Sequence, residues 1–289
     1  MSSALSFLWW RLTHPQRDAV RRAIIVHAES SGLAARDAEV REAVEFLRSN
    51  PLHHFPAAFV EKYRPADHRA HWDAAIGLHY VEHAGHKLYW RGGRKAKRIP
   101  GDYTALLAEQ DERSPHRYLV PGFDVQPGDI VADVGCAEGN FALEVVERAA
   151  HVYLFEADGR WAKALETTFA PWKHKVTISR SLVGKQSGDG MVALDDFFAG
   201  KAPPTFLKLD VEGYEADVLN GARATLARAC NVRAAVCTYH RQEDEANLTA
   251  LLHELGFTTE PSPGYMLLYR EPNFGPPYFR RALLRATKA

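Results

Sequence analysis

The chain has 289 residues, enough for one large domain or for a core domain with an appended region. Lys plus Arg and Asp plus Glu both number 36, so the formal net charge is zero and argues against nucleic acid as a partner. The three cysteines have no metal-ligand spacing and an odd count, which favours free thiols and a cytoplasmic location. No apolar run approaches the roughly 20 residues that a transmembrane segment needs.

The first part of the chain is predicted to be helical. Apolar residues recur at three- and four-residue spacing over 19–27 and 35–48. Before them, Phe7, Trp9 and Trp10 suit either packing against the main domain or a membrane surface, and we expect packing.

A small β-hairpin and a basic run follow. Residues 76–81 and 87–90 alternate as two strands. Residues 91–98 then carry five cations, which form either a solvated loop or a clamp for an anionic acceptor. Tyr89 and Trp90 precede them, and such rings can stack on a sugar. We therefore expect this N-terminal region to cap the site where a substrate binds.

The most informative stretch is a strand, a glycine turn and a helix in direct succession. Residues 130–134 are apolar and mostly β-branched apart from Asp133, Gly135 and Gly139 bracket the turn, and helical spacing begins at Phe141. This order is typical of the first βα unit of a nucleotide-binding α/β fold. A dinucleotide fingerprint has three glycines, whereas this turn has two.

Two acidic residues near this turn favour a ligand without phosphates. Asp133 lies within the first strand, where a carboxylate suits a cationic amino-acid end such as that of S-adenosylmethionine (SAM). Glu156 ends the second strand, 23 residues further on, and can accept hydrogen bonds from both ribose hydroxyls. We therefore predict SAM as the ligand.

The rest of the chain alternates strands and helices. Strands are predicted at 175–179, 206–209 and 234–239, helices at 159–169 and 247–255, and a closing hairpin across 256–269. This alternation predicts a Rossmann-like, doubly wound, mostly parallel seven-stranded sheet with a terminal antiparallel hairpin. The expected divisions are an N-terminal region (1–115), a SAM-binding domain (116–272) and a basic C-terminal tail (273–289) that is either a docking helix or a loose end.

The catalytic candidates follow the fourth and fifth strands, since ligands of open α/β sheets bind at the carboxyl ends. Asp210 and Glu212 follow the fourth strand, and His240 follows the fifth. An alcohol acceptor needs a general base, or a metal that acidifies its hydroxyl. One hypothesis makes His240 the base and lets Asp210 orient it or the acceptor. The other places a divalent ion such as Mg on Asp210 and His240, with Glu212 as a further ligand. Glu212 and Glu215 also suit the N–H groups at a helix N-terminus.

Taken together, these motifs resemble the FkbM family of SAM-dependent methyltransferases. The matching strings are Asp133-Val-Gly-Cys-Ala-Glu-Gly139, Leu194-Asp-Asp-Phe197, Phe206-Leu-Lys-Leu-Asp-Val-Glu-Gly-Tyr-Glu215, Val218-Leu-Asn-Gly-Ala222 and Tyr239-His-Arg241. The resemblance covers 118–269 and implies a class I methyltransferase fold, SAM as donor and a hydroxyl acceptor. It also implies that SAM is bound by Asp133, Gly135, Cys136, Gly139, Asn140, Glu156, Arg180 and Ser181.

The predicted function is SAM-dependent O-methylation of a saccharide or glycoconjugate hydroxyl. A natural-product hydroxyl of polyketide type is the alternative acceptor, and the acceptor class includes anionic molecules. Two other classes share parts of the pattern: an NAD-dependent oxidoreductase and a non-catalytic SAM-binding scaffold. The missing third glycine disfavours the first, and the intact Asp210 and His240 disfavour the second.

Overall fold

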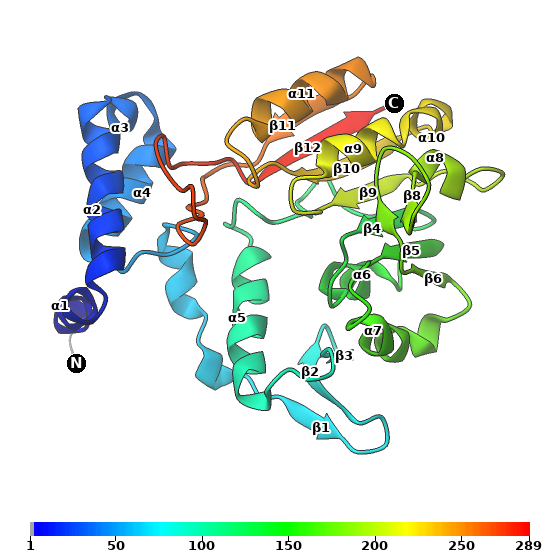
Figure 1. Cartoon of the computed structure of the whole chain (residues 1–289), viewed down its shortest axis with the longest axis horizontal. Coiled ribbons are helices and arrows are strands. Elements are labelled where there is room, and N and C mark those ends of the chain that lie inside the picture. The colour runs from blue at the N-terminus through cyan, green and yellow to red at the C-terminus, as the bar shows by residue number, and fades with distance from the viewer. Residues whose placement is uncertain (1–2) are drawn as a thin grey trace.

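The computed structural model describes residues 3–289, which are built around one twisted sheet with helices on both faces (Figure 1). The sheet has seven strands, in the spatial order β11 (Thr258–Pro261), β12 (Leu283–Lys288), β10 (Val232–Cys237), β9 (Phe206–Leu209), β4 (Ile130–Val134), β5 (His151–Phe155) and β6 (Val176–Ser179). Neighbouring strands from β10 to β6 are parallel, and β12 is antiparallel to both β10 and β11. The predicted fold class is confirmed.

Alternate residues of the central strands face two separate cores, as the period of two requires. Val131 and Phe206 pack with one set of helices, α5 (Ile99–Glu109), α6 (Asn140–Val145) and α7 (Ala162–Thr168). Ala132 and Leu207 pack with the other set, α8 (Leu194–Phe197), α9 (Glu215–Asn220), α10 (Arg223–Arg228) and α11 (Asp244–Glu254). The parallel strands are therefore buried on both sides, which explains their continuous apolar runs.

Short elements complete the chain. The predicted hairpin is present and gains a third strand, giving a sheet of β1 (His71–Asp73), β2 (Leu78–His83) and β3 (His86–Tyr89). Two further strands, β7 (Leu182–Val183) and β8 (Met191–Val192), pair in parallel beside the main sheet. The 3₁₀ turns are η1 (Ala58–Lys62), η2 (Pro65–Asp67), η3 (Ala96–Arg98) and η4 (Ala170–Trp172).

The C-terminal part of the chain differs from the prediction. The closing hairpin expected across 256–269 is instead made by β11 and β12, and the expected basic tail contains β12, which lies between two other strands. The basic residues made this segment look like a solvated tail in the sequence. In the structure their charged ends have partners within the protein. Arg285 is buried and donates to the carbonyl oxygen of Arg117 at 2.8 Å, and Arg281 pairs with Glu39.

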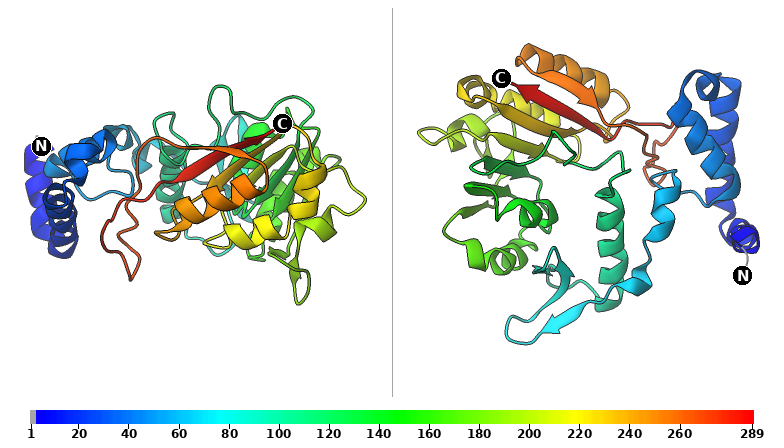
Figure 2. Two further views of the ribbon diagram at one scale, coloured as in Figure 1. Left: turned by 90° about the horizontal axis from the view of Figure 1, so that it is seen from above. Right: turned by 180° about the vertical axis from the view of Figure 1, so that it is seen from behind.

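The N-terminal helices stand at one end of the molecule, away from the sheet (Figure 2). They are α1 (Ser3–Thr13), α2 (Pro15–Ser30), α3 (Leu33–Arg36) and α4 (Ala38–Ser49). Their core, which includes Ile24 and Leu47, also holds Leu267 and Phe279 from the excursion, the segment 262–282 that joins β11 to β12. The N-terminal helices are thus fastened to the sheet through the excursion.

Candidate active site

A cleft of about 910 Å³ lies at the carboxyl ends of β4, β5, β9 and β10. Six of the predicted site residues line it: Gly135, Glu156, Ser181, Asp210, Glu212 and His240. The other five, within the described chain, do not: Asp133, Cys136, Gly139, Asn140 and Arg180. The edge of the sheet was predicted correctly, but the set of exposed side chains was not.

Gly135 forms the floor of the cleft where β4 and β9 end side by side. Its φ is +75°, and a Cβ atom there would lie 2.0 Å from the carbonyl oxygen of Asp210. Only glycine meets both demands, because it lacks Cβ and tolerates positive φ. The turn therefore brings the end of β4 against the residue that centres the site.

Asp133 was expected to face the ligand but is fully buried. Its neighbour in register on β9 is Lys208, and the Lys208 Nζ lies 3.0 Å from an Asp133 carboxylate oxygen. Lys208 also donates to the Gly135 carbonyl oxygen at 2.6 Å. Since adjacent side chains in register share a face of the sheet, Lys208 takes the place predicted for the ligand's ammonium group.

Four other predicted SAM contacts also lie away from the cleft. Gly139 starts α6 with φ +81°, and a Cβ there would meet Phe169 at 2.8 Å, so this glycine permits close packing. Cys136 and Asn140 are buried. Arg180 is exposed and pairs with Glu166 of α7 at 2.5 Å.

Glu156 stands at the end of β5 with its carboxylate fixed by the backbone. One oxygen accepts from the N–H of Ala137 in the glycine turn at 2.9 Å, and the other from the N–H of Asp158 at 2.7 Å. Each carboxylate oxygen keeps a further acceptor position. The side chain is thus oriented in advance toward donors in the cleft.

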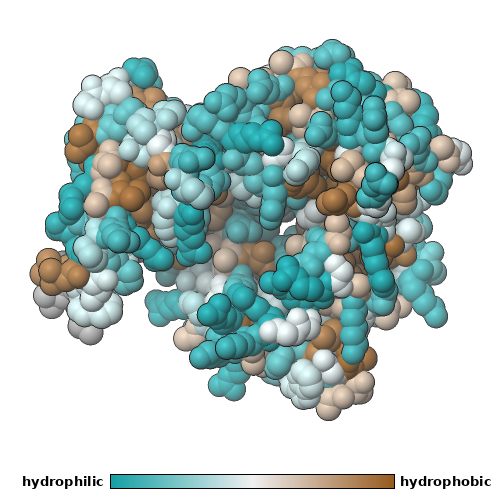
Figure 3. All heavy atoms as spheres, in the orientation of Figure 1, coloured by the Kyte–Doolittle hydropathy of each residue, from teal (hydrophilic) through white to brown (hydrophobic). Residues whose placement is uncertain are grey.

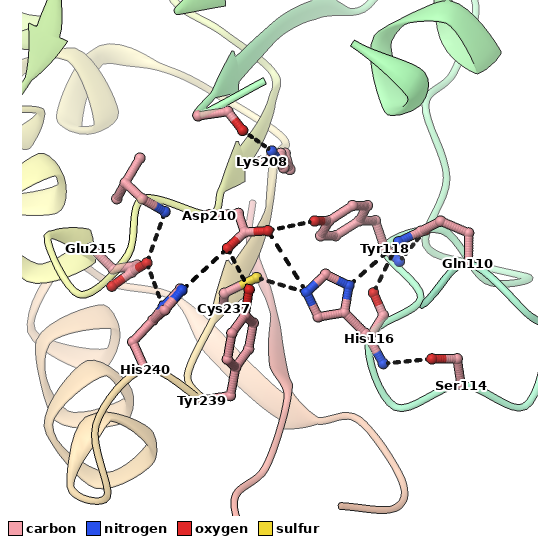
Figure 4. A network of polar contacts seen from close by, with 12 residues as sticks. Gln110, Ser114, His116, Tyr118, Lys208, Asp210, Glu215, Cys237, Tyr239 and His240 are labelled. Carbon is pink, nitrogen blue, oxygen red and sulfur yellow. Dashed lines mark hydrogen bonds and ion pairs between the residues drawn. The ribbon is translucent and has the colours of Figure 1, made fainter. Parts of the chain in front are cut away.

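Asp210 is the centre of the polar network in Figure 4. Its two carboxylate oxygens accept from the hydroxyls of Tyr118 and Tyr239, each at 2.9 Å. Burial would raise the pKa of Asp210, but the charge of Lys208, the adjacent histidines and the Tyr239 hydrogen bond hold it well below its usual value. A carboxylate that is so well stabilised is a poor proton acceptor.

His240 lies between Asp210 and Glu215 (Figure 4). Its Nδ1 is 3.1 Å from a Glu215 carboxylate oxygen, and its Nε2 is 3.5 Å from an Asp210 oxygen. Burial would lower the pKa of His240, but the hydrogen bond to Glu215 and the charge of Asp210 raise it above its ordinary value. The contact with Glu215 favours a proton on Nδ1, and Nε2 lies beside the Asp210 carboxylate at the edge of the cleft.

Glu215 is the site residue that the sequence did not single out. Its buried carboxylate accepts from the N–H of Val211 at 3.0 Å, in the loop before α9 rather than at the helix N-terminus as expected, and it also contacts His240. Glu212, the expected partner, is exposed at φ +53° and lies in the cleft wall apart from this cluster. The turn between them sends one acidic side chain inward and the other outward.

Two groups of side chains have the spacing of metal ligands: Asp210 with Glu215 and His240, and Asp210 with His116 and Cys237. Both oxygens of Asp210 already accept one tyrosine hydroxyl each, and Glu215 accepts the N–H of Val211. The amide nitrogen of Gln110 lies 3.5 Å from His116 Nδ1, while its oxygen accepts from the Tyr118 N–H. His116 therefore carries its proton on Nε2, the atom that faces Asp210, and this tautomer does not ligate a metal there.

The cleft is strongly acidic. Five carboxylates line it, against Arg160 and His240 as the basic side chains: Glu156, Asp158, Asp210, Glu212 and Glu271. Behind them, burial and the charge of Asp210 raise the pKa of Glu109 to about 8, and burial raises that of Glu138 to about 7. The five carboxylates outnumber the two basic side chains of the lining, so the cleft favours a cationic ligand over a pyrophosphate.

The expected acceptor contacts of the N-terminal region lie elsewhere. Tyr89 and Trp90 are buried in hydrophobic clusters, and no cleft-lining residue among 3–289 precedes Val134. Of the basic run, Arg91 comes nearest, 3.4 Å from the cleft residue Asp158. The wall opposite the glycine turn includes Leu268 and Glu271 of the excursion.

Together, the strand order with one antiparallel strand, the glycine turn and the cleft at the carboxyl ends define a Rossmann-like class I methyltransferase fold. Residues 120–259 match the model of the methyltransferase FkbM domain. The chain therefore carries a methyltransferase domain of the FkbM family, which confirms the family that the motifs predicted.

Solved structures were also compared with the chain. The methyltransferase FkbM from Methylobacillus flagellatus KT is similar with a TM-score of 0.49 and 16% identity, over 66% of this chain and 53% of that one. The chain thus spans about half of that protein's length. Magnesium protoporphyrin IX methyltransferase from Synechocystis PCC 6803, solved with bound SAM, gives a TM-score of 0.42 and 16% identity, over 68% and 87%. No curated protein matches the sequence.

Proposed function

We propose that the protein is a SAM-dependent O-methyltransferase that methylates a hydroxyl, most simply of a saccharide or glycoconjugate. The observation that carries this proposal is the Glu215–His240 pair, which places a histidine able to act as a base at the cleft, with Nδ1 facing Glu215 and Nε2 on the side of Asp210. An N- or S-methyltransferase needs no such base when its acceptor is already neutral and nucleophilic, whereas an alcohol must lose a proton.

When bound, SAM supplies an electrophilic methyl group on a sulfonium, and its positive charge suits the acidic cleft. Glu156 would accept hydrogen bonds from its ribose hydroxyls. His240 Nε2 takes the proton of the acceptor hydroxyl, and Glu215 holds the ring and stabilises the imidazolium. Asp210 remains ionised beside His240 and stabilises the same cation. No step is routed through a metal.

The saccharide preference rests on cleft side chains other than the proposed donor contacts. Tyr214, more than half exposed, offers a ring for stacking, and Glu212 and Glu271 offer acceptors for several hydroxyls. A polyketide-type hydroxyl is the second candidate for the same base. The acidic wall argues for a neutral or cationic acceptor.

The donor assignment is tested by calorimetric titration of SAM, with NADH as control, into the wild-type protein and Glu156→Gln. Replacing the carboxylate keeps the size of the side chain but weakens the ribose contacts. SAM affinity is expected to fall about ten- to a hundredfold. Preferential binding of NADH would instead support an oxidoreductase, and SAM binding with no methyl transfer to any hydroxyl would support a scaffold.

Chelation is expected to leave the activity unchanged. The carboxylates that could hold an ion already accept hydrogen bonds from tyrosines and backbone N–H groups. Methyl transfer should therefore proceed at the same rate after dialysis against EDTA. If EDTA abolished the activity and added Mg or Mn restored it, the result would support a metal ion on Asp210 and His240.

A further inference from the structure

Helix α1 carries an apolar face that points into solvent. Leu8, Trp9 and Leu12 are 50%, 63% and 74% exposed, and they share one side of the helix because they are one, three and four positions apart. Figure 3 shows hydrophobic atoms protruding at this end of the molecule. Three adjacent large apolar side chains in water indicate a surface that contacts something else.

The opposite side of α1 already fastens it to the protein. Phe7 and Trp10 stack with their ring centres 6.2 Å apart, the guanidinium of Arg21 lies 5.0 Å from the Phe7 ring, and Trp10 packs on the core of the N-terminal helices. Packing of these aromatics against the main domain was expected; Phe7 and Trp10 pack instead within the N-terminal helices, and Trp9 is exposed. The face formed by Leu8, Trp9 and Leu12 therefore stays exposed although α1 is packed against the other N-terminal helices.

The charges around this face have one sign. Residues 3–27 contain four arginines and one acidic residue, Asp18. Asp18 is buried and paired with Arg21 at 2.8 Å, and the partly exposed Arg11 and Arg22 also contact its carboxylate. One carboxylate therefore faces three arginines, and Arg17 is exposed beside them. The protein as a whole has no net charge, so this end is locally cationic because of its sequence.

We propose that α1 docks on the surface of an anionic lipid bilayer. Leu8, Trp9 and Leu12 enter the boundary between headgroups and acyl chains, and the arginines of α1 and α2 contact lipid phosphates. Tryptophan beside leucine, with arginine at the flank, is the composition of helices that lie in this boundary. At 11 residues α1 is far too short to cross a bilayer, and none of the other helices in residues 3–289 has the length and apolar character to do so. The proposal is independent of the reaction.

The test is co-sedimentation of the full chain with vesicles of phosphatidylcholine alone and of phosphatidylcholine with phosphatidylglycerol in equal amounts. The double variant Trp9→Gln/Leu12→Gln removes the exposed face, and it should fold because both side chains are solvent-exposed. Trp72→Ser is the matched control, since Trp72 is 57% exposed on β1. Circular dichroism and the melting temperature check folding of each variant.

Wild type and Trp72→Ser are expected to bind the anionic vesicles, and the double variant to bind them at least about tenfold more weakly. Binding should fall as salt is added, because the arginines act through charge. Equal binding to neutral vesicles would overturn the proposal. A second result would also overturn it: the wild type binds neither kind of vesicle but forms a dimer in sedimentation velocity, and the double variant is monomeric. The exposed face would then join two copies of the chain.

Discussion

Replacing His240 by asparagine is expected to lower kcat by about 10²- to 10⁴-fold while SAM binds with nearly unchanged affinity. Asparagine keeps a donor for Glu215, which lies 3.1 Å from His240 Nδ1, but it has no atom that accepts the hydroxyl proton. The measurement is single-turnover methyl transfer to an acceptor hydroxyl, with calorimetry for SAM. Unchanged turnover in this variant would remove His240 from the mechanism.

The chain contains a matched control for this histidine. His83 is also buried, and its Nε2 lies 3.5 Å from Glu144, but the pair lies outside the cleft. The variant His83→Asn therefore loses a buried histidine–carboxylate contact without touching the proposed site. Its kcat is expected to stay within about twofold of wild type, whatever happens to its melting temperature.

The pH profile separates the base from the residue that positions it. His240 must be neutral to accept a proton, so activity rises with pH through its pKa, which is raised above the ordinary value of about 6.5. Glu215→Gln keeps an oxygen for Nδ1–H but removes the charge that favours the imidazolium. The pKa of His240 then falls, and the acid limb of kcat/KM moves to lower pH. A purely structural role for Glu215 would leave that limb in place.

The second large effect is expected from Gly135→Ala. A Cβ atom at this position would lie 2.0 Å from a backbone oxygen of β9's exit loop, at a φ of +75°. Neither the oxygen nor the turn can move without separating β4 from β9. We expect the free energy of unfolding to fall by about 3 kcal/mol or more, with loss of SAM binding. Chemical denaturation and calorimetry measure the two losses.

Gly128→Ala isolates the steric part of that effect. Gly128 has a φ of +90°, but a Cβ there would meet nothing within 4 Å. This variant retains the conformational penalty and loses the clash, so it should cost only about 1–2 kcal/mol and leave SAM binding unchanged. Equal losses in the two variants would contradict the role given to the contact between Gly135 and Asp210.

The sequence predicted the sheet well because its central strands carry their own signal. Residues 206–209 were assigned to the same four positions that form β9, since a strand buried on both faces is apolar throughout. Strand β12 was missed, because Arg281, Arg285 and Lys288 make its surroundings look like a solvated tail. Their partners are distant in sequence, and Arg285, for example, is held by the carbonyl of Arg117.

The site was predicted at the level of its edge and its two central residues. Asp210 and His240 follow from strand order alone, because parallel strands bring their carboxyl ends together. Tyr118 donates a hydrogen bond to Asp210 from 92 positions earlier in the chain, and no local sequence pattern predicts this contact. Glu215 carried a misleading signal, since a carboxylate at a helix start is explained by the helix itself.

The excursion between β11 and β12 adds residues to a cleft that is otherwise formed by the strands and the loops that follow them. The donor side, with Gly135 and Glu156, belongs to the sheet. The excursion contributes Leu268 to the cleft, and its neighbour Leu267 donates its N–H to the carbonyl oxygen of His54 at 2.8 Å. The excursion is thus tied to the N-terminal region through Leu267 and to the sheet through Leu268, which packs on the sheet's core, and Arg280, which donates to the carbonyl oxygens of Tyr239 and His240.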